Sequence, residues 1–187
     1  DLLCEAPSTF NELLLSGTIW NTSLTILVKS FALAHRLTDT YFHNFITHLL
    51  EAAFKQGLHL IEEGGTFGAS KLNSIMKEVL TEFWEMPLKS MMSGFDWMRQ
   101  SHYYMGLYSY TYSAGLVIST AGYLHLKNSE NGAKDWLDLL KSGGSKTPLE
   151  SAMIIGADIS TDKPLRDTIN SFQTLWIKHA YSAELGE

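Results

Sequence analysis

The sequence contains a single cysteine, Cys4, among its 187 residues. One thiol excludes an internal disulfide framework and is typical of proteins in a reducing compartment. Basic residues are also scarce, since 14 Lys and Arg stand against 20 Asp and Glu, for a formal net charge of −6. A nucleic-acid-binding protein needs a basic stripe for the phosphates, which this balance does not favour. We therefore expect a cytoplasmic protein with no nucleic-acid partner.

Long apolar runs are absent as well. No run reaches the roughly 18 residues of a membrane-spanning helix, and Lys29 interrupts the nearest one, at 24–33. The first residues lack the basic start and the cleavage site of a signal peptide. We expect neither a membrane span nor a secretion signal.

No segment alternates apolar and polar residues over the length of a strand, whereas apolar residues recur every three or four positions along most of the chain. This spacing predicts an all-α fold, a multi-helix single domain over residues 1–187, in which 86–101 are irregular. Thr38 and Ser70 are expected to cap helices, and Gly17 to end or bend one. We expect the helices at residues 7–17, 23–37, 38–60, 70–83, 103–126, 131–141 and 147–156, and from 161–164 onward.

Two carboxylates near the start, Glu5 and Glu12, are seven residues apart, almost two helical turns, and so lie on one side of a helix. Two interpretations remain open at this point. Acids near a helix N-terminus are favourable because of the helix dipole. A metal ligand followed by a carboxylate that supports it would show the same spacing.

Most of the seven histidines have no partner pattern. His43 and His48 are five residues apart, which is not the four-residue spacing of a helical metal pair, and His35 lies a further eight residues back. We interpret these three as surface or half-buried histidines without a metal. The same interpretation covers His59, His125 and His179.

His102 stands apart because tyrosines follow it closely. Three of them recur every four residues and predict one stripe along a helix: Tyr104, Tyr108 and Tyr112. Tyr110 would point toward His102 if the backbone turned near Gly106. These phenols either pack in the core with their hydroxyls hydrogen-bonded, or face a cavity with His102 and stabilise a developing negative charge.

The chain resembles a known peptidase family at three places that occur in family order. Residues 5–12 resemble the segment after the His-Glu-x-x-His helix of the thimet oligopeptidase and oligoendopeptidase F zinc peptidases. Residues 102–115 resemble the His/Tyr-rich segment of the oligoendopeptidase F branch, and residues 140–145, 148–150 and 156–158 resemble its C-terminal end. The chain is therefore identified as the C-terminal helical part of a zincin-like oligopeptidase, a metalloprotease that hydrolyses oligopeptides.

The resemblance implies roles for six residues. Glu5 matches the third zinc ligand and Glu12 a second acidic position that supports it. His102 and Tyr110 match the pair that stabilises the tetrahedral intermediate or binds the substrate backbone. Tyr108 is a second candidate for that role. Tyr104 is a weaker candidate, for substrate binding.

The sequence departs from the family in one decisive respect, because it contains no His-Glu-x-x-His motif. That motif supplies two zinc ligands and the general base. Residues 99–101 also differ from the Ile-Pro that the family leads us to expect before His102. We therefore expect a parent enzyme whose N-terminal part carries the motif, and a chain that alone is inactive and binds zinc weakly or not at all.

An alternative of a different class is a helical module without a metal motif that associates with itself. A missing lobe would leave apolar surface exposed, and such patches favour association. We expect the contacts on a face that includes Phe10, Tyr108 and Tyr112. The coding sequence upstream of Asp1 separates the two hypotheses, because only a parent enzyme has the motif there.

Overall fold

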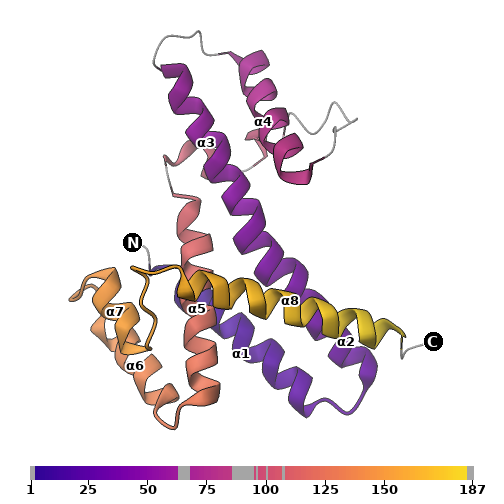
Figure 1. Cartoon of the computed structure of the whole chain (residues 1–187), viewed down its shortest axis with the longest axis vertical. Coiled ribbons are helices and arrows are strands. Elements are labelled where there is room, and N and C mark those ends of the chain that lie inside the picture. The colour runs from indigo at the N-terminus through magenta and orange to yellow at the C-terminus, as the bar shows by residue number, and fades with distance from the viewer. Residues whose placement is uncertain are drawn as a thin grey trace. The chain divides into compact units, whose positions relative to one another are not determined.

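A computed structural model of the chain describes residues 3–62, 68–85, 95, 97–99, 101–106 and 108–184. Every regular element in these ranges is helical, which confirms the all-α prediction (Figure 1). The chain divides into two compact units. The first unit consists of Asp1–Phe45 and Thr111–Glu187, and the second unit consists of Ile46–Tyr110. The elements are α1 (Ala6–Thr22), α2 (Ile26–His35), the π-helix η1 (Arg36–Thr47), α3 (His48–Glu62), α4 (Ala69–Trp84), the 3₁₀ helix η3 (Ser101–Tyr104), α5 (Tyr110–Asn128), α6 (Gly132–Ser142), α7 (Pro148–Ile154) and α8 (Lys163–Glu184).

The core of the first unit forms where α1, α5 and α6 meet. Phe10 of α1 stacks on Trp136 of α6, with ring centroids 3.8 Å apart and planes 14° from parallel. Gly122 of α5 makes room for the indole, since a Cβ at that position would lie 2.7 Å from the Trp136 ring. Small residues on α5 therefore allow the aromatic pair to pack between the helices.

Helix α7 begins as the sequence predicts. The Thr147 hydroxyl accepts a hydrogen bond from the Glu150 N–H, and the Glu150 carboxylate accepts one from the Thr147 N–H, a reciprocal capping box. Pro148 occupies the first position of the helix, where its missing N–H costs nothing. Beyond the helix, Gly156 adopts a φ of +70°, a conformation that suits glycine.

Several predicted helix ends are wrong. Thr38 caps nothing, because its hydroxyl donates to the Ala34 carbonyl while the chain continues as η1. Ser70 lies inside α4, which has Gly68 as its N-cap. Gly17 does not end α1, which runs on to Thr22. The helix predicted from 103 starts only at Tyr110. Most of the stretch 86–101 that the sequence predicts to be irregular lies outside the described residues.

The second unit has a smaller core. Helix α3 packs against α4 and η3, and Phe54 of α3 contacts Tyr103 edge to face, with ring centroids 5.4 Å apart. The buried apolar residues around Phe54 come from α4: Leu72, Ile75 and Met76. This core fixes η3, and with it His102, against α3.

No helix in the described part of the chain is long and apolar enough to cross a membrane.

Candidate functional site

Three polar side chains lie buried along one face of α3, at positions 48, 51 and 55. His48 is 1% exposed, Glu51 0% and Lys55 4%. Spacings of three and seven residues place them on the same side of the helix. Charged side chains are almost never this buried unless they are paired, so their partners define the site. With the buried Ser109, these residues are named here the α3 polar cluster.

Two hydrogen bonds pair the residues of the α3 polar cluster. His48 Nδ1 lies 2.9 Å from Glu51 Oε2, and Lys55 Nζ donates to Ser109 Oγ at 2.9 Å. Because an ionised carboxylate only accepts, His48 carries its proton on Nδ1, and in the neutral ring Nε2 has the lone pair.

The electrostatics keep Glu51 ionised. Burial raises the pKa of Glu51, but the hydrogen bonds from His48 and Ser109 and the attraction to His48 and His102 outweigh burial and hold it below its ordinary value. Burial lowers the pKa of Lys55, an effect that the negative charge of Glu51 partly opposes. The site therefore holds a buried carboxylate ion whose Oε2 is bonded to His48, whereas its buried Oε1 makes no hydrogen bond within the described residues.

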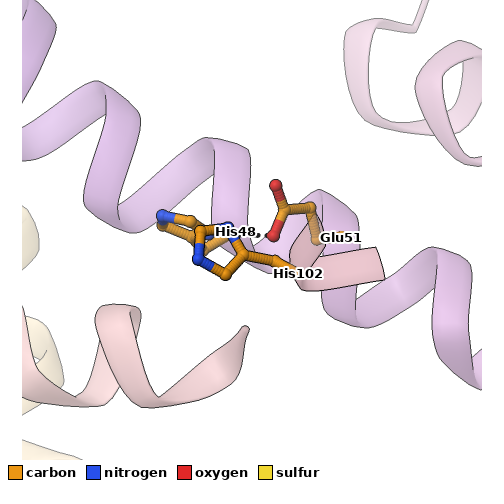
Figure 2. A group of neighbouring side chains, drawn as sticks. All are labelled: His48, Glu51 and His102. Carbon is orange, nitrogen blue, oxygen red and sulfur yellow. Dashed lines mark hydrogen bonds and ion pairs between the residues drawn. The ribbon is translucent and has the colours of Figure 1, made fainter. Parts of the chain in front are cut away.

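His102 approaches this carboxylate from η3. Its ring meets the His48 ring edge on, with centroids 5.4 Å apart and planes at 79°, and Figure 2 shows both imidazoles beside the Glu51 carboxylate. On its other side, Tyr108 stacks on His102 with centroids 5.9 Å apart and planes at 22°. His102 is half-buried, so it joins the buried cluster to the surface.

The same residues offer a set of metal donors. One ligand atom each from His48, Glu51 and His102 lies within 4.8 Å of the others. Two imidazoles and a carboxylate form a donor set of catalytic zinc sites. Lys55 is attracted to the same carboxylate, so a cation entering this group would share Glu51 with an ammonium already present.

The two N-terminal carboxylates belong to the first unit. Glu5 is the N-cap of α1, and its Cβ would lie 2.9 Å from a Cβ at Gly115 of α5, so glycine lets the start of α1 approach α5. Glu12 accepts a hydrogen bond of 2.7 Å from the Thr40 hydroxyl. Both side chains are half-buried. The close approach to Gly115 positions the start of α1 at Glu5, and the hydrogen bond from Thr40 positions the Glu12 carboxylate.

The predicted tyrosine stripe does not exist as one helix face. Tyr104 lies in η3 and is 67% exposed, Tyr108 lies in a turn, and Tyr112 lies in α5. The backbone does turn at Gly106, where φ is +57°. The phenol in ring contact with His102 is nevertheless Tyr108, whereas Tyr110 is 44% exposed.

Of the histidines predicted to be exposed or half-buried, those whose side chains the structure describes are so placed, except for His48. His35 is 51% exposed and 3.9 Å from Asp39, and the half-buried His125 is bonded to Asp135 at 2.8 Å. The prediction is wrong for His48, which is buried and grouped with His102 rather than with a neighbour on its own helix. The side chains of His59 and His179 lie outside the described residues.

Sequence reasoning missed Glu51, Lys55 and Ser109. The available signal was that His48, Glu51 and Lys55 share one helix face with the buried Tyr41 and Asn44, at three- and four-residue steps. Polar residues that continue a buried face indicate a buried network. The pairing with His102, 51 residues after Glu51, left no trace in local spacing.

Known proteins match this chain along most of its length. The model of peptidase family M3 matches residues 3–171. An oligoendopeptidase F homolog of Borreliella burgdorferi is 28% identical in an alignment of 180 residues that covers 90% of this chain and 29% of that protein. The plasmid-encoded oligoendopeptidase F of Lactococcus lactis subsp. cremoris is 29% identical over 166 residues, 86% of this chain and 27% of that protein. The chain thus spans less than a third of the length of these relatives.

Two solved structures of peptidases have a fold similar to that of this chain. A putative peptidase from Chlamydophila abortus superimposes with a TM-score of 0.83 at 28% identity, over 97% of this chain and 31% of that one. The oligoendopeptidase F of Enterococcus faecium superimposes with a TM-score of 0.85 over 98% of this chain and 36% of that one, and at 22% identity it shows the shared fold alone. From the family match and these relatives together, the chain belongs to peptidase family M3.

Proposed function

We propose that this chain is the C-terminal portion of a zinc-dependent endopeptidase that hydrolyses oligopeptides, and that residues 1–187 alone are inactive. The observation that carries the proposal is the family match over residues 3–171. The motif that would supply two zinc-binding histidines and the general base is absent from the sequence. A preceding part of the same protein would provide it. We expect the parent enzyme in the cytoplasm, in line with the single cysteine of residues 1–187.

In this proposal Glu5 is the carboxylate ligand of the zinc. The ion would supply Lewis-acid polarisation of the scissile carbonyl and activation of a water. Of the three protein ligands of such a site, this chain supplies one, Glu5, which is half-buried at the start of α1 beside Gly115. Glu12 would support the site from the next turns of α1, where the Thr40 hydroxyl holds its carboxylate.

His102 and a tyrosine would bind the oxyanion that develops on the substrate carbonyl. A neutral donor aimed at that oxygen stabilises the transition state more than the ground state. The stack of Tyr108 on His102 supports Tyr108 for this role, beside the Tyr110 that the family resemblance implies. The exposed Tyr104 would contact the substrate outside the reacting atoms.

The test uses the full-length protein translated from the complete coding sequence. Tyr108→Phe and Tyr110→Phe each remove one hydroxyl, and loss of an oxyanion donor should lower kcat by about 10²–10³ with little change in KM. Tyr112→Phe in α5, which has no role in this proposal, is the matched control and should leave kcat near the wild-type value. If both Tyr108→Phe and Tyr110→Phe kept the wild-type kcat, the tyrosine role would be wrong. If no zinc-dependent peptidase activity appeared at all, the enzyme proposal itself would fail.

A second candidate function is self-association, and exposed apolar residues on α2 favour it. Leu27 is 78% exposed and Phe31 is 69% exposed, four residues apart on the same helix face. The face expected from sequence is wrong in one residue, because Phe10 is 3% exposed and stacked on Trp136. Light scattering on residues 1–187 should give a dimer or larger species, and the double change Leu27→Ser and Phe31→Ser should give a monomer. A wild-type monomer would contradict this candidate.

A further inference from the structure

A cavity of about 350 Å³ opens in the first unit between η1, α5 and α8. Cavities of a few hundred Å³ are the size that small molecules occupy. Two basic side chains line it together with Tyr123, Arg36 from η1 and Lys127 from α5. The acid in this lining, Asp167, is bonded to Lys163 at 2.5 Å. The lining therefore carries an excess of positive charge.

Arg36 is the most unusual of these residues because it is buried, with 8% of its surface exposed. A buried guanidinium is normally paired with a carboxylate. Within the described ranges no carboxylate lies within 4.0 Å of it, and its Nε, which is buried, makes no hydrogen bond. Its guanidinium carbon lies 4.7 Å from the centre of the Tyr123 ring and 5.8 Å from that of Tyr41. Aromatic faces thus stabilise the cation, while an N–H donor stays unused.

Lys127 brings a second positive charge to the same ring. Its Nζ lies 4.5 Å from the centre of the Tyr123 ring, on which the Arg36 guanidinium also lies. Burial raises the pKa of Tyr123, but these two cations outweigh burial and lower it. Two cations therefore converge on one aromatic ring.

The position of Tyr123 depends on glycine. A Cβ at Gly17 of α1 would lie 2.1 Å from the Tyr123 hydroxyl, so only glycine leaves space for the phenol. A smaller cavity of about 60 Å³ lies beside the same three side chains, with Trp20 of α1 in its lining. The arrangement of Arg36, Tyr123 and Lys127 is therefore built into the packing of α1 against α5.

We propose that Arg36 and Lys127 bind a small oxyanion in this cavity, the chemistry shared by phosphates and carboxylates. The guanidinium offers planar donors that match two oxygens of such a group, and the ammonium adds a point charge. The volume leaves room for a ligand larger than the bare oxyanion group. The two sources of this chemistry are a phosphorylated small molecule and the free carboxylate of a peptide or organic acid. The site contains none of the residues assigned to peptide hydrolysis and is independent of that assignment.

Calorimetric titration of residues 1–187 tests the proposal at constant ionic strength. The probes are inorganic phosphate, acetate, and one tripeptide with either a free or an amidated C-terminus. Saturable binding of phosphate alone identifies phosphate ligands, and binding of acetate and the free peptide but not the amide identifies carboxylates. Arg36→Lys and Lys127→Gln should each weaken binding at least about tenfold, which is about 1.4 kcal/mol.

Two controls make the result decisive. Lys141→Gln removes the same charge from an exposed position on α6 and should keep wild-type affinity. Lys127 is itself exposed, so Lys127→Gln leaves the core intact even if Arg36→Lys disturbs folding. The absence of saturable binding to every probe would overturn the proposal. So would a loss of affinity in Lys141→Gln equal to that in Lys127→Gln, since binding would then follow net charge alone.

Discussion

His48 and Glu51 share a hydrogen bond of 2.9 Å at a place where neither side chain has more than 1% of its surface exposed. A carboxylate so far from water keeps its charge only because protein groups replace the water. The stability of the second unit therefore depends on this charge.

Glu51→Gln should destabilise the protein by about 1–3 kcal/mol, since it removes the buried charge that His48, Ser109 and Lys55 surround. Urea unfolding measures the difference. Glu78→Gln on α4 is the matched control, because Glu78 is exposed, and it should stay within about 0.5 kcal/mol of wild type. Equal effects of the two substitutions would show that the Glu51 charge contributes nothing.

The stability difference between wild type and Glu51→Gln should also depend on pH. The pKa of Glu51 in the folded state lies below its ordinary value of 4.5. A carboxyl of this kind contributes stability that is fully present above its unfolded pKa and is lost as the pH falls through the folded pKa. Repeating the unfolding series from neutral to acidic pH should make the two free energies converge. A difference that grew on acidification would have the wrong sign.

Residues 1–187 should bind zinc only weakly, although His48, Glu51 and His102 offer three donors. Lys55 already shares the charge of Glu51, so a zinc ion would meet an ammonium beside its carboxylate ligand. Lys55→Met should raise the affinity about tenfold or more, equivalent to about 1.4 kcal/mol. Competition with a chromophoric chelator measures it.

The exposed His43 supplies the control for that experiment. His43→Ala should leave zinc affinity unchanged and His48→Ala should abolish it. Zinc binding that survived His48→Ala would come from another place on the chain.

Gly115→Ala tests how α1 is positioned. Alanine is favoured over glycine inside a helix by about 1 kcal/mol, but here its Cβ would lie 2.9 Å from the Glu5 Cβ and 3.1 Å from the Ala6 nitrogen. Since the backbone at Ala6 cannot give way as a side-chain end can, overpacking should win, with a net loss of about 1–3 kcal/mol. In the full-length protein the zinc content should fall as well.

Gly144→Ala is the comparison, because nothing lies within 4 Å of a Cβ at that position. It should leave both the unfolding free energy and the zinc content near wild type. An equal effect of the two glycine substitutions would show that the contact with Glu5 is unimportant.

Phe10→Ala should destabilise the first unit by about 3–5 kcal/mol, because it removes a buried ring stacked on Trp136 and leaves a cavity. Urea unfolding followed by tryptophan fluorescence measures the loss. Phe31→Ala at a 69% exposed position should change stability by no more than about 0.5 kcal/mol. A larger loss of stability in Phe31→Ala than in Phe10→Ala would contradict the burial of Phe10 in the core.

The helical class and most helix positions were predictable because apolar spacing and caps are local. Thr147 and Pro148 start α7 where the sequence predicts, since a capping box needs only four consecutive residues. The long helix expected from 103 was wrong because Gly106 takes a positive φ and separates η3 from α5. The 12-residue π-helix η1 was also missed, and π-helices are rare.

The site was predictable only in part. Glu5, Glu12 and His102 came from resemblance to a family, whose placement of these residues in the reaction stays a prediction. The α3 polar cluster could not be read locally, since Lys55 meets Ser109 only through the fold, 54 positions later. Pairing of His102 with Tyr108 instead of Tyr110 depends on the turn between η3 and α5, which spacing does not reveal.

The contact between the start of α1 and α5 also has a consequence for the order of synthesis. Thr9 donates a hydrogen bond to Ser119, 110 residues later, one turn beyond Gly115. At about 5–20 residues per second, the ribosome makes α5 about 5–20 s after α1. Until then α1 can pack only against α2, so in the proposed enzyme Glu5 would reach its place beside Gly115, and an ion that depends on it would be bound, only after α5 has been made.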